Sequence, residues 1–289
     1  MRWTPGQRSE NLEDRRGEGG GGASFGRPGG MKLGCGGILF LLVLSIVFKQ
    51  DFFQLLDTTG GGGGLTAPAA PAGPAQSTAE EEKMADFVSF VLDDVQNTWQ
   101  QAFPKFGETY RDARLVLFRS GIDSGCGFAE AATGPFYCPA DQKVYIDLSF
   151  YDELDRRFGA PGDFAQAYVL AHEIGHHVQN LLGIERQVRA AQQQRPRAAN
   201  QLSVALELQA DCFAGMWARS TAQRQLLEEG DLEEGLGAAS AVGDDRIQKQ
   251  ATGRVNPDTF THGSAKDRAT WFRRGLENGT IQACDTFGN

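Results

Sequence analysis

Residues 163–182 read DFAQAYVLAHEIGHHVQNLL, and this stretch decides how the rest of the chain is interpreted. Its apolar residues recur at helical spacing, with Asp163 as a candidate N-cap and Gly183 as a candidate C-terminal stop, so it predicts one helix. That helix is apolar nearly all round, which predicts that it is buried. Three of the four histidines of the chain lie in it. Buried imidazoles need partners, and a metal ion is one such partner.

The spacing of two of these histidines predicts a zinc site. His172 and His176 are four residues apart, so they lie on one face of the helix, about one turn from each other. Glu173 projects beside them, where it can act as a general base. This is the HExxH pattern of zinc proteases. Surface histidines on a polar helix are the alternative, and the apolar flanks of the motif argue against it.

The third ligand of a catalytic zinc must come from another element. A second helix is predicted over about 200–222, and it carries Glu207 and Asp211 four residues apart on one face. We expect Glu207 to bind the metal and Asp211 to accept a hydrogen bond from a metal-bound histidine. Their apolar neighbours would bury both acids, and an unpaired buried acid is costly. His177 is the competing ligand, but it is rotated by about 100° from His176 around the helix.

The remaining histidine, His262, precedes an amphipathic helix predicted from Ser264 to about residue 275. We expect it to donate a hydrogen bond to the oxyanion of a tetrahedral intermediate, assisted by the positive end of the helix dipole. An exposed position at a helix start is the alternative. Arg268 is expected to brace the same loop through a carboxylate such as that of Asp258.

The surrounding pattern indicates an α+β domain over residues 80–289, mainly helical, with a small antiparallel sheet. A helix is predicted over 80–103 and a strand over 114–118, because their apolar residues recur at the matching periods. Residues 134–138 and 143–148 flank a short turn and predict a hairpin. Helical patterns return near 230–250.

The first 79 residues differ from the rest in composition. Residues 1–32 are rich in Gly and Arg and are predicted to be a disordered, cytoplasmic N-terminus. Residues 33–56 contain the uncharged run LGCGGILFLLVLSIVF and are predicted to be a transmembrane anchor region. Basic residues are concentrated before this run, which favours a catalytic domain outside the cytoplasm. A cleaved signal peptide is the alternative. Residues 57–79 are predicted to be a flexible Gly/Ala/Pro linker.

Charge and cysteine content limit the partners and the compartment. The net charge is -9 and no basic stripe is present, so nucleic acid is not an expected partner. Four of the five cysteines lie in the predicted domain. Four cysteines allow three pairings; we expect Cys126 with Cys138 and Cys212 with Cys284, in an oxidising compartment. Four free thiols are the alternative for a cytosolic protein.

Four separated segments together resemble a known family: FYCPADQKVYIDLSF, HEIGHHVQ, ELQADC and THGSAKDRATWFRRGL. The chain is similar over nearly its whole length to the predicted neutral zinc metallopeptidases of bacterial membranes. The resemblance implies a zincin-like, gluzincin-type catalytic core with one zinc ion, acting on peptides. It also implies a single-pass protein of the bacterial inner membrane with a periplasmic catalytic domain.

A second resemblance covers the His262 loop. Thr261, His262 and Gly263, followed by Arg268, resemble the Thr-His-Pro…Arg segment of integral-membrane zinc proteases that include the prenyl-protein endopeptidases. Gly263 stands in this sequence where those proteins have proline.

Two further interpretations remain open. One is a non-catalytic, membrane-anchored module that binds zinc structurally, for which Cys212 would be the nearest fourth ligand. The other is a zincin fold that has lost its activity and serves as a binding partner. The substrate, the cleavage preference and the oligomeric state do not follow from the sequence.

Overall fold

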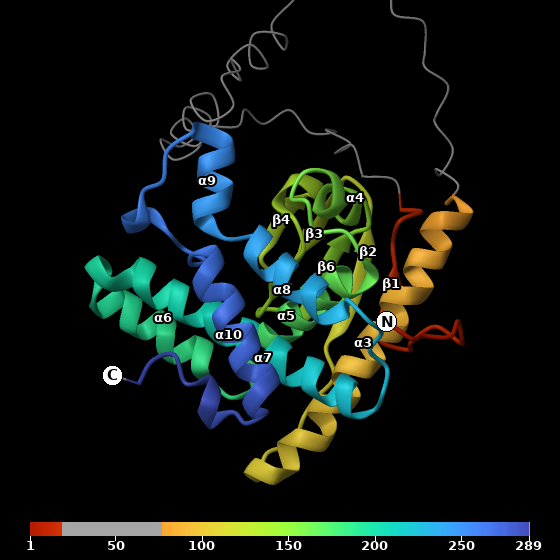
Figure 1. Ribbon diagram of the computed structural model, residues 1–289, viewed down its shortest axis with the longest axis horizontal. Coiled ribbons are helices and arrows are strands. Elements are labelled where there is room, and N and C mark those ends of the chain that lie inside the picture. Colours follow the sequence, from red (N-terminus) through yellow and green to blue (C-terminus); the bar gives the residue numbers. More distant parts are fainter. Residues whose placement is uncertain (19–76, 289) are drawn as a thin grey trace, which may run out of the picture. The chain divides into compact units, whose positions relative to one another are not determined.

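The computed structural model describes residues 1–18 and 77–288, and its elements are labelled in Figure 1. The longer helices are α3 (Ala79–Ala102), α5 (Asp163–Leu181), α7 (Ala199–Gln223) and α10 (Ala265–Asn278). The shorter helices are α4 (Ser149–Arg156), α6 (Ile184–Gln194), α8 (Asp231–Ala241) and α9 (Asp244–Thr252). The strands are β1 (Leu12–Asp14), β2 (Arg114–Phe118), β3 (Gly121–Ser124), β4 (Gly127–Glu130), β5 (Phe136–Cys138) and β6 (Lys143–Asp147).

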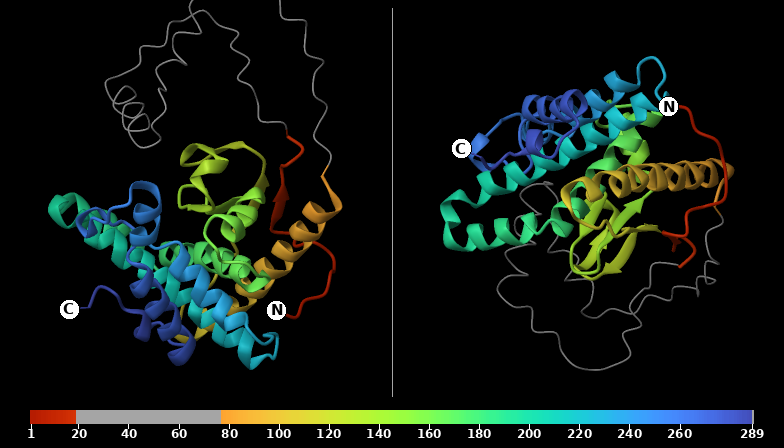
Figure 2. Two further views of the ribbon diagram at one scale, coloured as in Figure 1. Left: turned by 45° about the horizontal axis from the view of Figure 1, so that its top comes forward. Right: turned by 90° about the horizontal axis from the view of Figure 1, so that it is seen from below.

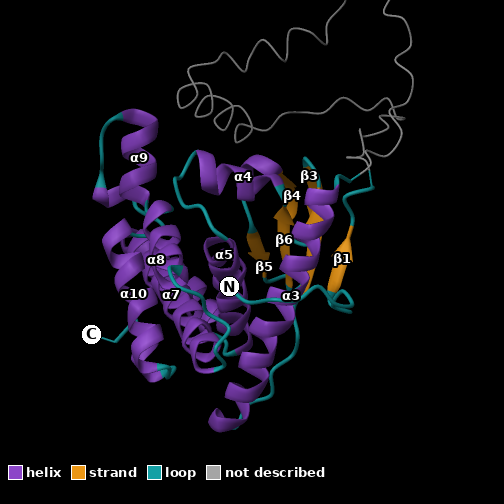
Figure 3. Cartoon of the chain, turned by 45° about the vertical axis from the view of Figure 1, so that its right-hand side comes forward, coloured by secondary structure: helices purple, strands orange, loops and turns teal. Residues whose placement is uncertain are grey.

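Helix α5 occupies the centre of the folded unit. It contacts β5 and β6 on one side and α7 and α8 on the other, and Figure 3 shows it between the strands and the helical bundle. Most of its residues are buried, as its apolar pattern predicts. The helix therefore carries its histidines into the interior, where the protein can fix their orientation.

The main sheet differs from the prediction. Its strand order is β1-β2-β6-β5, and only β5 runs antiparallel to its neighbour. Strands β1, β2 and β6 pair in parallel. The predicted hairpin is confirmed as β5 and β6, but the sheet as a whole is mixed rather than antiparallel. The reason is that β1 and β2 come from distant parts of the chain, so no hairpin turn sets their direction. The antiparallel pair β3 and β4 forms a separate two-stranded sheet.

The disorder predicted for residues 1–32 is wrong for residues 1–18. This segment runs beside α3 and the sheet (Figure 2), forms β1, and buries the Met1 side chain to 4% exposure. Composition predicts disorder because the segment is polar, rich in arginine and without hydrophobic periodicity. Two of its arginines, Arg8 and Arg16, are instead paired with acids of α3, as in the contact of Arg16 with Glu82 at 2.9 Å. Pairing removes the cost of bringing these charges against a folded surface.

The predicted anchor region, residues 33–56, and residues 57–76 of the predicted linker lie outside the described residues. The last linker residues begin α3, because Thr78 and Glu81 form a capping box. Within residues 1–18 and 77–288, no helix combines the length and the apolar character needed to cross a membrane.

Several helix boundaries differ in detail from the predictions. The N-cap of α5 is Gly162 rather than Asp163, and Asp163 is the first helical residue. Gly183 follows α5 in the left-handed conformation expected of a stop. The 230–250 region is two helices, α8 and α9, separated at Gly243, whose Cα lies too close to the Ala265 backbone for a side chain.

Both predicted disulfides are confirmed. Cys126 is bonded to Cys138, and Cys212 is bonded to Cys284. The second bond connects α7 to the short 3-10 helix Gln282–Cys284 near the C-terminus.

Candidate metal centre

Three side chains from two helices converge on one point. His172 and His176 come from α5 and Glu207 comes from α7, and one donor atom of each lies within 4.8 Å of the other two. The Nε2 atoms of His172 and His176 lie 3.1 Å and 3.5 Å from the Glu207 carboxylate. The i, i+4 spacing within α5 places the two rings on one face. The predicted ligands are therefore brought together by the fold.

A glycine on α5 lets α7 come this close. A Cβ added at Gly175 would lie 3.0 Å from the backbone oxygen of Ala210. The two helices are thus in near backbone contact between the two histidines. A side chain at this position would push Glu207 away from the imidazoles.

The outward nitrogen of His172 is held by a buried charged network. Its Nδ1 donates to Asp211 at 2.9 Å, and the Asp211 side chain is fully buried. Arg268 of α10 donates to both Asp211 oxygens, at 2.8 and 2.9 Å, and the Tyr168 hydroxyl makes a short hydrogen bond to the same carboxylate. Burial opposes ionisation of Asp211, but Arg268 and His172 outweigh it and lower the pKa of this carboxyl. Asp211 therefore fixes the ring as the sequence predicts, while Arg268 compensates its charge instead of bonding Asp258.

The outward nitrogen of His176 is held by a neutral network. Its Nδ1 donates to Gln179 Oε1 at 2.8 Å. The Gln179 amide donates in turn to the Leu206 carbonyl and to Gln209 Oε1, which fixes the orientation of that amide. Gln209 then donates to the carbonyl of Cys284. Residues of α7 and the carbonyl of Cys284 therefore fix the orientation of the His176 imidazole.

These contacts test whether the residues fit a metal ion. Both Nδ1 atoms carry their proton toward an acceptor, so each ring presents its Nε2 lone pair to the Glu207 side of the site. Two imidazole nitrogens and one carboxylate are a common donor set of catalytic zinc. Burial opposes protonation of His176, but the Glu207 charge outweighs it and raises the pKa of His176 to about 9. The cluster thus attracts positive charge at its centre, and it fits a divalent cation.

His177 is directed away from this cluster. Its Nε2 lies 2.6 Å from the Arg111 carbonyl and its Nδ1 lies 3.0 Å from the Tyr137 hydroxyl. Burial lowers its pKa to about 4. A neutral imidazole with both nitrogens engaged elsewhere is not available as a third ligand. Cys212 is likewise unavailable, because its sulfur is bonded to Cys284.

The cluster opens into a cavity of about 610 Å³. The cavity is also lined by Glu173, whose side chain lies on the same turn of α5 as His172. Among the described residues, none donates a hydrogen bond to the Glu173 carboxylate. The remaining wall is largely apolar and aromatic. Its apolar members include Pro135, Phe136, Pro139, Phe150, Phe158, Val169, Leu206, Val242 and Ile247.

His262 faces the same cavity from a loop that Asp244 organises. One Asp244 oxygen accepts the backbone N–H groups of Thr261, His262 and Gly263 at 2.7, 2.7 and 3.0 Å. The other lies 3.2 Å from Nδ1 of His262. This hydrogen bond outweighs desolvation and raises the pKa of His262. Gly263 has φ +98°, a conformation that proline cannot adopt. The loop thus needs glycine at this position.

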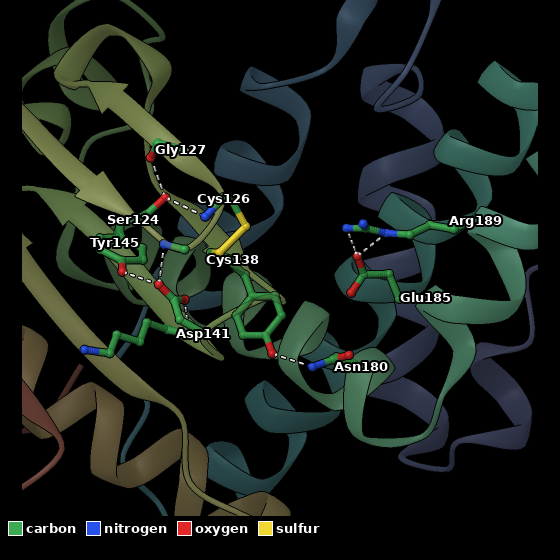
Figure 4. Close-up of a disulfide and its surroundings, with 12 residues drawn as sticks. Ser124, Cys126, Gly127, Cys138, Asp141, Tyr145, Asn180, Glu185 and Arg189 are labelled. Carbon is green, nitrogen blue, oxygen red and sulfur yellow. Dashed lines mark hydrogen bonds and ion pairs between the residues drawn. A yellow bond between two sulfur atoms is a disulfide. The ribbon is translucent and has the colours of Figure 1, made fainter.

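The cavity wall opposite the bundle is the outer strand β5. The Cys126–Cys138 disulfide fastens the β3–β4 hairpin to the end of this strand (Figure 4). At its centre, the Tyr137 hydroxyl accepts a hydrogen bond from Asn180 of α5 at 2.9 Å. The Tyr137–Asn180 contact fixes the position of β5 relative to α5, and the disulfide attaches the β3–β4 hairpin to β5.

Comparison with known proteins agrees with this arrangement. A family model described as "Putative neutral zinc metallopeptidase" matches residues 1–287. The chain belongs to this neutral zinc metallopeptidase family. Family membership extends over the N-terminal segment as well as the histidine helix.

Two relatives of this chain illustrate the extent of the similarity. The Escherichia coli (strain K12) protein YpfJ is 49% identical over 294 residues, which cover 100% of this chain and 99% of YpfJ. The Mycobacterium bovis protein Mb2605 is 45% identical over 204 residues, which cover 67% of each chain. No solved structure matches the chain significantly.

Sequence reasoning missed four residues that hold this site together: Tyr168, Gln179, Gln209 and Asp244. A signal existed for Gln179, because it follows His176 by three residues and so shares its helix face. Asp244 is 18 residues from His262, and only the folded loop brings the two together.

Proposed function

We propose that this chain hydrolyses peptide bonds with one zinc ion bound by His172, His176 and Glu207. The observation that carries the proposal is the convergence of both Nε2 atoms and the Glu207 carboxylate at the wall of a large cavity. Each ring is oriented by a hydrogen bond from its other nitrogen, as is usual for zinc-bound histidines. A zinc ion, when bound, supplies a Lewis acid that acidifies water and polarises the substrate carbonyl.

The residues of the chain carry the remaining steps. The Glu173 carboxylate takes a proton from the attacking water and delivers it to the leaving amine. The His262 imidazolium donates a hydrogen bond to the oxyanion that forms on the carbonyl oxygen when water attacks the carbonyl carbon. Its hydrogen bond to Asp244 favours the protonated form needed for this role. In this mechanism Glu207 binds the metal and Glu173 acts as the base, which is the arrangement of a gluzincin.

The position of the substrate is proposed from the sheet. β5 is an outer strand of the described sheet, and Phe136 and Tyr137 line the cavity. An extended peptide can pair with the outer edge of such a strand through its main chain. The aromatic and apolar wall would then receive the side chains beside the scissile bond.

A Glu173→Gln variant tests the proposal. The amide retains the shape of the side chain but cannot accept the water proton. We expect peptidase activity to fall by roughly 10²–10⁴, with about one zinc per chain retained as for the wild type. Activity is measured by profiling peptides released from a proteome digest, and zinc by elemental analysis. Equal peptide profiles for the two proteins would contradict the proposal and favour a non-catalytic zinc module.

A further inference from the structure

The N-terminal segment is built into the same folded unit as the metal centre. β1 pairs in parallel with β2, with Leu12, Glu13 and Asp14 in register with residues 115, 116 and 117. The backbone of Arg15 also donates to the Leu117 carbonyl at 2.8 Å, and Leu115 donates to Asn11 at 2.9 Å. Backbone hydrogen bonds of this kind require the two segments to lie side by side.

The arginines of this segment are used within the fold. Arg8 lies 2.7 Å from Asp86 and 2.5 Å from Glu82, both on α3. The Arg16 side chain is only 3% exposed and lies 2.6 Å from Asp14 and 2.9 Å from Glu82. The sequence suggests that these positive charges retain the N-terminus in the cytoplasm. In the structure, Arg8 and Arg16 instead attach the segment to α3.

We propose that residues 1–18 and residues 77–288 lie in the same compartment, so that the chain between them crosses a membrane an even number of times or not at all. A hydrocarbon core is about 30 Å thick, and a β-ladder cannot form across it. The predicted single crossing between the N-terminus and the catalytic domain would separate β1 from β2. It would also leave Glu82 and Asp86 without the arginines that neutralise them.

The test uses two single-cysteine reporters in the full-length chain. Cys35 is changed to serine, and the Cys35→Ser parent without a reporter cysteine measures any labelling of the four remaining cysteines. Glu10→Cys then reports the N-terminal segment, and Glu277→Cys reports the helical domain; both positions are exposed. Spheroplasts of a bacterium that produces either variant are treated with a membrane-impermeant maleimide, and lysed cells give the maximal labelling.

We expect the two cysteines to behave alike, either both labelled in intact spheroplasts or both protected until lysis. Labelling of Glu277→Cys with protection of Glu10→Cys would overturn the proposal, because it is the pattern of a single crossing. This readout does not depend on peptidase activity.

A matched pair of arginine variants tests whether the segment is docked in the full chain. Arg16→Gln should lower Tm by roughly 3–6 °C, because it removes charged hydrogen bonds from a buried side chain. Arg15→Gln should have little effect, because the Arg15 side chain is 36% exposed and its ion pair is with Glu18 of the same segment. Small and equal shifts for both variants would mean that the segment is not docked, which would also overturn the proposal.

Discussion

Asp244 determines which atom of His262 faces the cavity beside the metal centre. Its two oxygens accept three backbone N–H groups and lie within hydrogen-bonding distance of the Nδ1 atom of the ring. The Nε2 atom is then left for the cavity. At the scale of single residues, the proposed oxyanion donor His262 therefore depends on Asp244. The Asp244 carboxylate orients the imidazole and favours its protonated form.

This pairing predicts how activity depends on pH. The protonated form of His262 is the donor, so kcat should fall as pH rises through its pKa, which Asp244 raises. Asp244→Asn should move this alkaline limb of the kcat profile to lower pH. His262→Ala should lower kcat by roughly 10²–10³ and retain zinc. Asp245→Asn is the control, because Asp245 bonds the Ala265 backbone and not the ring. An alkaline limb unchanged in Asp244→Asn would remove His262 from the mechanism.

Arg268 belongs to the same scale, because it neutralises the buried acid behind His172. In Arg268→Gln, the fully buried Asp211 loses its charge partner, and we expect a loss of about 3–5 kcal/mol of stability. Zinc affinity should fall by roughly 10–100-fold, because His172 is no longer oriented. Zinc binding is measured by chelator competition. Arg273→Gln, on the exposed face of the same helix, should change neither quantity. Unchanged zinc affinity in Arg268→Gln would show that Asp211 orients His172 without help from Arg268.

At the scale of helices, glycines set how closely α7 and α10 pack, and the two lie side by side in Figure 1. A Cβ at Gly215 would overlap the Phe272 carbonyl oxygen, and a Cβ at Gly275 would overlap the Cys212 carbonyl oxygen. These atoms are backbone, so they cannot move without moving the helices. Close packing is what lets Arg268 of α10 reach into α7.

The close packing of α7 against α10 predicts that a methyl group added at Gly275 destabilises the protein, and the same change at Gly237 is the control. Gly275→Ala should destabilise the protein by about 3 kcal/mol or more, because the helices must separate. Gly237→Ala, in α8, has open space around the new methyl group and should be stabilising by roughly 0.5–1 kcal/mol. Chemical denaturation of both variants measures the difference. Equal stabilities would mean that the α7–α10 contact is not close.

The elements also show what a sequence can and cannot predict. Helices α5 and α7 follow from long stretches rich in apolar residues, and the four-residue spacing of His172 with His176 and of Glu207 with Asp211 predicts which side chains share a face. β1 has only three residues, Leu12–Asp14, and no alternating pattern, so its strand conformation is decided by the distant partner β2. The same holds for Arg268, whose partner is an acid 57 residues earlier. Local pattern predicts the residues that point the same way on one helix. It does not predict which helix they meet.

At the scale of the whole molecule, two disulfides stabilise different regions. Cys212–Cys284 spans 72 residues and Cys126–Cys138 spans 12. Removing either pair should cost about 3–4 kcal/mol, mainly through the freedom gained by the unfolded chain. Only removal of Cys212–Cys284 should also weaken zinc binding. The Cys284 carbonyl accepts a hydrogen bond from Gln209, and Gln209 in turn orients Gln179, which holds His176. Double Cys→Ala variants, titrated with zinc, measure this. Equal zinc affinities in both would disconnect the C-terminal segment from the metal site.

The pairing of β1 with β2 also has a consequence for the order in which the molecule assembles. Residue 12 is synthesised roughly a hundred residues before its partner, residue 115. At a synthesis rate of about 5–20 residues per second, the N-terminal segment waits on the order of 5–20 seconds before β2 exists. It cannot fold locally during that time, because its hydrogen-bonding partners and the acids of α3 have not yet been synthesised. A segment that is made before its partners is therefore among the last to reach its folded position. Closing a loop of roughly a hundred residues makes that final step slow.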